Sequence, residues 1–213
     1  MAIDNFIANF LEIKDPNIEF HEAFQTIKEN GVTTKILSGT LSYPLEACPK
    51  CGVRNKSTQD MIKYGFAEST IKLPSMNFNA LVLKLKKQKY QCKHCGEYSL
   101  VTTPLVDPGC FISNDLKRMV AVELGEVQSM TLIARRYSIS DYTVVKVLKK
   151  AGKALAPSYR TLPEHIGIDE FKSVKSVQES MSCILMDAHE KKLFDILPDR
   201  KQNAIRDYFM RYS

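Results

Sequence analysis

The pattern of hydrophobic and polar residues predicts strands in the first half of the chain. Residues 35–43, 69–73 and 80–90 are rich in β-branched and aliphatic side chains that partly alternate with polar ones, as is typical of half-buried strands. Pro74 and Asn79 separate the second strand from the third. We therefore expect a β-rich segment before residue 100.

From Phe111 onward the apolar residues follow a helical period. Ser113 or Asn114 can cap a first helix that ends near Gly125, and Ser129 precedes a second helix over 130–136. Ser140 caps a third helix, from Asp141 to about Ala151, which Gly152 can end. The apolar positions of the first helix are Leu116, Met119, Val120, Val122 and Leu124.

The tight link over residues 137–139 favours a helix-turn-helix. Ala134 is small enough for two helices to cross closely, and Ile139 can fill the turn. Ser138 stands where such turns often use Gly, so it must tolerate a costly backbone geometry or form a different turn. A plain three-helix bundle explains the same periodicity. The other residues expected inside are Ile133, Tyr137, Val144 and Val147.

The two ends of the chain add further elements. Residues 166–171 predict a strand, 182–187 and 192–197 a hairpin, and the segment after residue 200 an amphipathic helix. At the other end, an amphipathic helix with Phe6, Ile7, Phe10 and Leu11 precedes Lys14-Asp15-Pro16, and it fits either core packing or a contact between protomers.

Composition and charge narrow the class of protein. The 213 residues are 44% hydrophobic and 25% charged, which is typical of globular chains. No apolar stretch is long enough to span a membrane and no secretory signal is recognisable, so we expect no membrane partner and a cytoplasmic, nucleoid-associated location.

The positive charge is concentrated in the centre of the chain, although the formal net charge is only +6. Residues 48–110 carry ten Lys and Arg against four Asp and Glu, and residues 111–165 carry nine against five. A basic centre attracts phosphate backbones, although a solvated lysine-rich face is the alternative.

Four of the six cysteines form two Cys-x-x-Cys-Gly pairs, Cys48 with Cys51 and Cys92 with Cys95. Two residues between thiols let one turn direct both sulfurs at one ion, and four thiolates complete a tetrahedral Zn²⁺ site with no open position for catalysis. Strands that lead to both turns predict a zinc ribbon. A thioredoxin-like redox pair is the alternative for one such motif, but two pairs argue against it.

One histidine and two further cysteines are potential metal ligands with simpler interpretations. His94 lies between two ligands and could replace one, but four thiols make this unnecessary. Cys110 and Cys183 have no partner at ligand spacing, so we expect each to be a small buried residue.

Two groups of residues are candidates for contact with DNA. Lysines along the 80–90 strand either follow phosphates on a ribbon edge or protect an edge strand from aggregation. In the helix-turn-helix, the start of the third helix faces base edges and the flanking cations reach phosphates. The strand candidates are Lys84, Lys86, Lys87 and Lys89, the base-reading candidates are Ser140, Asp141, Tyr142 and Thr143, and the helical cations are Arg135, Arg136, Lys146, Lys149 and Lys150.

The order of these parts resembles the ISL-three family of bacterial insertion-sequence transposases. The resemblance rests on the two cysteine pairs, the helix-turn-helix, the strand IGIDEF, the hairpin and the segment LPDRKQNAIRDYF, and it covers the whole chain. It implies an RNase H-like catalytic domain in which two Asp and one Glu hold two Mg²⁺ or Mn²⁺ ions for strand cleavage and transfer.

Asp169 matches the first acid of the family motif and is the candidate catalytic residue. The alternative is an Asp at a strand end that bonds to the backbone. Neighbouring residues on a strand face opposite sides, so Glu170 cannot share its site. The second Asp and the Glu have no counterpart before Ser213, so we expect the intact family member, but not this chain alone, to cleave DNA. Asp187, Asp195 and Asp199 do not match the motif and are expected to be solvated or capping residues.

The sequence thus predicts an α+β, multi-domain chain. Three hypotheses follow: a DNA-binding part of a transposase that recognises the terminal inverted repeats of its element, with a possible homo-oligomer; a DNA-binding regulator or transposition inhibitor; or a zinc-ribbon protein that binds another protein or RNA. The expected domains are a leader at 1–43, a zinc ribbon at 44–110, a helix-turn-helix domain at 111–156, a linker at 157–165 and an incomplete RNase H-like α/β domain at 166–213.

Overall fold

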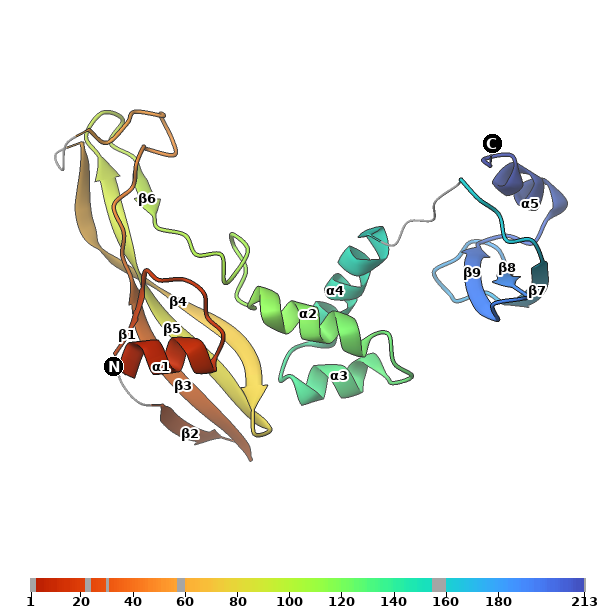
Figure 1. Cartoon of the computed structure of the whole chain (residues 1–213), viewed down its shortest axis with the longest axis horizontal. Coiled ribbons are helices and arrows are strands. Elements are labelled where there is room, and N and C mark those ends of the chain that lie inside the picture. The colour runs from red at the N-terminus through yellow and green to blue at the C-terminus, as the bar shows by residue number, and fades with distance from the viewer. Residues whose placement is uncertain (1–2, 22–23, 30, 57–59, 155–159, 213) are drawn as a thin grey trace. The chain divides into compact units, whose positions relative to one another are not determined.

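A computed structural model of the chain describes residues 3–21, 24–29, 31–56, 60–154 and 160–212 (Figure 1). Within these residues the fold is mixed α+β, with two sheets and five helices, as expected from the sequence. The chain divides into two compact units, residues 1–151 and 152–213. The start of the expected linker, residues 157–159, lies outside the described residues.

The first unit is built on one sheet of six strands. Its main order is β1-β3-β5-β4, while β2 pairs with β3 and β6 with β5. The pairs are antiparallel except β3 with β5, which is parallel. The bounds are β1 Ile18–Phe20, β2 Gln25–Glu29, β3 Val32–Leu41, β4 Met61–Met76, β5 Asn79–Cys92 and β6 Tyr98–Leu100.

Strands β4 and β5 form a long hairpin. Asn77 and Phe78 both have positive φ, 49° and 60°, as a tight turn matched to the twist of the strands requires. Pro74 lies inside β4 and does not end it, contrary to the sequence prediction. Because β4 is the edge of the main strand order, a missing N–H is tolerated there, next to the irregularity between Leu73 and Met76.

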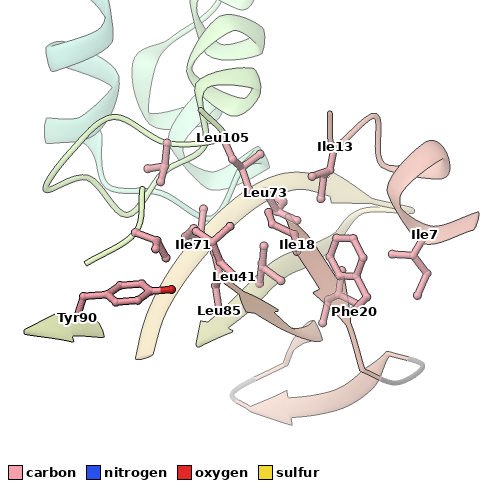
Figure 2. Packing of buried hydrophobic residues seen from close by; sticks show 14 of the residues in the cluster. Ile7, Ile13, Ile18, Phe20, Leu41, Ile71, Leu73, Leu85, Tyr90 and Leu105 are labelled. Atoms are coloured by element: carbon pink, nitrogen blue, oxygen red, sulfur yellow. The ribbon is translucent and has the colours of Figure 1, made fainter. Parts of the chain in front are cut away.

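One hydrophobic core joins the expected leader to the expected ribbon (Figure 2). Helix α1, Ile3–Phe10, contributes Ile7, and β1 contributes Ile18 and Phe20. These side chains pack in one cluster with Leu41 of β3 and Leu85 of β5. A boundary at residues 43 and 44 therefore does not separate two cores. Phe6 and Phe10 of α1 are exposed and stack on each other with ring centroids 6.1 Å apart.

Three helices complete the first unit: α2 Asn114–Glu123, α3 Met130–Arg136 and α4 Asp141–Ala154. The hydroxyls of Ser113 and Ser129 cap α2 and α3 as expected, since each accepts a backbone N–H three residues on. Helix α4 continues past Gly152, which costs about 1 kcal/mol relative to Ala but does not end it. Their shared core contains Leu116, Val120, Ile133, Ala134, Tyr137 and Val144.

Hydrogen bonds connect the sheet to the helices. Segment 111–113 lies along the edge strand β4, where Lys72 donates its backbone N–H to Phe111 and accepts from Ser113, at 2.8 and 2.9 Å. The Lys72 ammonium also donates to the carbonyl of Ser138, 2.6 Å away. Asp107 accepts from Lys117 of α2 at 2.9 Å and from Lys150 of α4 at 3.3 Å. The sheet and the helices are thus joined at several points of one compact unit.

The second unit is a three-stranded antiparallel sheet with one helix. The strand order is β7-β8-β9, with bounds Ile166–Lys172, Met181–Asp187 and Lys192–Leu197, and α5 spans Gln202–Phe209. Cys183, Leu185 and Leu197 pack with Tyr208 of α5. None of the helices in the described ranges is long and apolar enough to cross a membrane.

Candidate metal centre and nucleic-acid interface

The two cysteine turns have the same backbone geometry. Gly52 donates its N–H to the carbonyl of Cys48 at 2.8 Å, and Gly96 donates to that of Cys92 at 2.9 Å. Both glycines have positive φ, 75° and 74°, a conformation that favours Gly. The Gly that follows each cysteine pair in the sequence is therefore explained by the positive φ that the turn requires. One turn follows β3 and the other ends β5, so the fold of the sheet brings them together.

The four thiols of the two turns form one cluster. All four sulfurs lie within 4.8 Å of one another. Cys48 Sγ is 3.8 Å from Cys95 Sγ, and Cys51 Sγ is 3.7 Å from Cys92 Sγ. In a regular tetrahedron with Zn–S bonds of about 2.3 Å, the sulfurs are about 3.8 Å apart. The cluster could therefore hold a metal ion such as zinc, and its geometry is compatible with a zinc ribbon.

Backbone N–H groups favour the thiolate form of Cys48. The N–H groups of Cys51 and Lys50 lower the pKa of the Cys48 thiol to about 7. At Cys95 a hydrogen bond from the backbone of Glu97 favours the thiolate, but desolvation and the neighbouring thiols outweigh it and raise the pKa to about 12. A metal must displace the protons that remain, so metal binding at this site depends on pH.

Asp60 connects the surroundings of the two turns. Its carboxylate accepts the backbone N–H of Lys56 at 3.2 Å and lies 3.2 Å from Nε2 of His94. Its carbonyl accepts the N–H of Lys93 at 2.9 Å. His94 is thus paired with a carboxylate and stays outside the thiol cluster.

The two remaining cysteines differ. Cys183 is buried as expected, and burial raises the pKa of its thiol. Cys110 is exposed, which contradicts the expectation of a buried residue. It lies in the loop between β6 and α2.

The candidate residues of α3 and α4 lie on the surface, but several are already engaged. Arg136 pairs with Glu123, and Lys150 with Asp107. Ser140 and Thr143 contact each other through their hydroxyls at 3.0 Å, and Asp141 accepts from Thr131. Tyr142 is 67% exposed, with the Lys146 ammonium 4.7 Å from its ring centroid. Arg135 and Lys149 are also exposed.

The lysine-bearing strand β5 is not at an edge of the sheet, so the edge position that both sequence-based interpretations assumed is wrong. β5 pairs with β4 along most of its length and with β3 over residues 80–87 on the other side. A strand in this position needs no protection from aggregation. The structure also separates the four lysines: Lys84 and Lys86 face one side of the sheet, and Lys87 and Lys89 the other.

Asp169 is exposed on β7, with Ile184 as its register partner on β8. Its Oδ1 accepts the N–H of Glu170 at 2.8 Å, so the carboxylate does bond to the backbone, although it lies within the strand and not at its end. Glu170 pairs with Arg200. Among the described residues, the cysteine cluster alone brings three or more potential metal ligands together, and Asp169 is not part of it.

The other acids of this unit are engaged locally. Asp187 and Asp199 accept backbone N–H groups in their own turns, as expected of capping residues. Asp195 instead accepts the hydroxyl of Tyr208 at 2.7 Å. Desolvation raises the pKa of this tyrosine, so it remains a donor.

Three connecting residues were missed at the level of sequence. Lys72, Asp107 and Glu123 link elements that are far apart in the chain, and no local pattern marks them. Lys72 and Glu123 lie inside a predicted strand and a predicted helix, and Asp107 lies between predicted elements, so their positions in the sequence did not indicate their partners.

Comparison with known protein families, curated proteins and solved structures gives no match to this chain.

Proposed function

We propose that this chain is the DNA-binding part of a bacterial insertion-sequence transposase of the ISL-three type. In this proposal a zinc ribbon and a helix-turn-helix recognise double-stranded DNA at the terminal inverted repeats of the element. Zinc has a structural role at the four cysteines. Cleavage would need Asp169 together with two further acids that hold Mg²⁺ or Mn²⁺.

The observation that carries the DNA-binding proposal is the turn between α3 and α4. Ile139 donates its N–H to the carbonyl of Ala134 and Ser138 donates to that of Arg135, at 2.9 and 3.2 Å, while Ser138 has a φ of 52°. This is a Schellman motif, which ends one helix sharply and starts the next after a short turn. The arrangement leaves the start of α4 exposed, as DNA-reading helices require.

Charge supports the same proposal. Arg135, Lys146 and Lys149 are exposed on α3 and α4, and the region 111–165 has a net positive charge. Positively charged side chains beside an exposed helix start suit contact with phosphates on both sides of a groove.

The test is binding of the full chain to duplex DNA selected from a randomised library. Fluorescence anisotropy across a salt series should give an affinity that falls linearly on logarithmic axes, because phosphate contacts release counterions. Tyr142→Ala should reduce the preference for the selected sequence over mixed-sequence DNA, whereas Lys149→Ala should weaken binding to both. Affinity that is independent of salt would overturn the proposal.

A non-catalytic regulator is the second candidate. It is favoured by the isolation of Asp169 from other potential metal ligands among the described residues. Nuclease assays with Mg²⁺, on this chain and on the product of the whole reading frame that encodes it, distinguish the two. Cleavage by either protein supports a transposase, and cleavage by neither supports a regulator.

A further inference from the structure

The two faces of β5 present different lysines. Leu83 and Leu85 are fully buried on one side of β5. Because successive side chains of a strand point to opposite sides, Lys84 and Lys86 lie on the other side, which is exposed. Farther along the strand Gln88 and Tyr90 are buried, and Lys87 and Lys89 lie on the side away from them. The four lysines thus belong to two surfaces.

The side chains of Lys87 and Lys89 contact other parts of the first unit. Lys87 lies in the wall of a cavity of about 530 Å³, and desolvation lowers the pKa of its amine. The ammonium of Lys89 lies over two tyrosine rings, 4.2 Å from the centroid of Tyr98 and 5.3 Å from that of Tyr64. Both side chains therefore have local roles that do not require a partner.

Lys84 and Lys86 have polar neighbours instead. Lys84 lies in register with Ser38 of β3 and Thr70 of β4, and Lys86 with Thr40 and Glu68. Neither lysine has an ion pair or side-chain hydrogen bond within the described part of the chain. Hydroxyls beside free ammonium groups are typical of surfaces that contact phosphates. Three acids of the described strands lie on this face and reduce its positive charge. Glu68 is opposite Lys86, Glu19 is opposite Thr40, and Glu29 is opposite Val32 at the far end of β3.

The face continues to the start of α4. Lys72 pairs in register with Val82, which places its side chain on the same side as Lys84 and Lys86. Its ammonium reaches the carbonyl of Ser138, two residues before the cap of α4. We call the surface formed by Lys72, Lys84 and Lys86, with Ser38, Thr40 and Thr70, the basic sheet face.

The spacing of these lysines suits a DNA strand. Alternate residues on a strand are about 6.6 Å apart, which is close to the distance between consecutive phosphates of one DNA strand. Lys84 and Lys86 can therefore face two successive phosphates. A backbone that runs along β5 can meet both ammonium groups in succession.

We propose that the basic sheet face is a second DNA-contact surface, which holds the phosphate backbone beside the segment that α4 contacts. The inference rests on the proposed function of α4. It assigns phosphate contacts to Lys84 and Lys86, and it removes Lys87 and Lys89 from the interface.

The test compares Lys84→Ala/Lys86→Ala with Lys87→Ala/Lys89→Ala in the full chain. Both variants lose the same charge from the same strand, so the second is a control matched in charge. The first should lower the salt slope of duplex affinity by about 1.8, at about 0.9 per phosphate contact. The second should leave the slope unchanged. Circular dichroism and zinc content verify that both remain folded.

Equal losses in the two variants would overturn the inference, because they would reflect general charge. An unchanged slope in the first variant, with binding still weakened by Lys149→Ala, would refute the sheet face and leave the proposed function intact. Salt-independent affinity of the unaltered chain would refute the proposed function itself.

A measurement on the unaltered chain avoids any effect of substitution on folding. Amine acetylation followed by mass spectrometry, with and without mixed-sequence duplex, reports which lysines DNA covers. Protection of Lys84 and Lys86, with no change at Lys89, supports the inference. Equal protection of all three, or protection of Lys89 alone, contradicts it.

Discussion

The ammonium of Lys72 on β4 donates a 2.6 Å hydrogen bond to the carbonyl of Ser138 in the turn between α3 and α4. Sixty-six residues separate the two positions. The bond satisfies a carbonyl that the turn leaves without a helical partner, and it fixes the turn to the edge of the sheet.

Replacing this lysine should destabilise the first unit. Lys72→Met removes a partly buried, charge-assisted hydrogen bond, so we expect a loss of about 1–2 kcal/mol in the free energy of unfolding. Urea titration followed by circular dichroism measures it. Lys63→Met, at an exposed lysine of the same strand, is the control and should change stability by less than about 0.5 kcal/mol. Equal effects of the two substitutions would contradict the role of the bond.

The backbone at Ser138 makes a second prediction. A φ of 52° is costly for a residue with a side chain and free for Gly. Ser138→Gly should therefore leave stability unchanged or raise it by up to about 1 kcal/mol, and Ser138→Val should lower it by about 1–2 kcal/mol because the side chain is β-branched. Thermal unfolding of both variants distinguishes this from an ordinary turn, in which the valine would be harmless.

The cysteine cluster predicts about one zinc ion per chain, bound with the stability of a structural site. Removal of zinc by a chelator should unfold the turns and weaken the sheet, as should Cys51→Ala. Cys110→Ala is the matched control, because this exposed thiol lies outside the cluster. Mass spectrometry under native conditions reports the metal, and loss of zinc in the control variant would refute the assigned ligands.

Acidification should weaken the three-helix part of the first unit. The hydrogen bond from Arg136 holds the pKa of Glu123 below its ordinary value of 4.5, and Gln128 and Tyr137 add to this effect. Because the folded-state pKa is the lower one, the stabilisation is complete above 4.5 and is lost as pH falls through the folded-state value. Unfolding measured between about pH 6 and 3 should show this loss, and Glu123→Gln should reduce it. A pH profile unaffected by the substitution would contradict the prediction.

Local chemistry in the sequence predicted many element boundaries. Ser113 and Ser129 are caps whose bonding partners lie three residues away, so the pattern alone defines them. The Cys-x-x-Cys-Gly pattern defines each turn for the same reason. Gly152 failed as a stop signal because the helix around it tolerates one Gly.

The long-range arrangement was not predictable in this way. The parallel pairing of β3 with β5 depends on residues more than forty positions apart, and it made β5 a central strand. The shared core of Ile7 and Leu85 likewise requires the folded sheet. Hydrophobic period identifies a strand and its faces, but it does not identify the neighbours of that strand.

Duplex DNA affinity of the full chain, measured across a salt series, tests directly whether this protein binds DNA. The proposed interface predicts a linear decrease of log affinity with log salt, with a slope of about −0.9 for each phosphate contact, and a shallower slope for Lys84→Ala/Lys86→Ala than for Lys87→Ala/Lys89→Ala. An affinity that does not change with salt would contradict DNA binding by this chain.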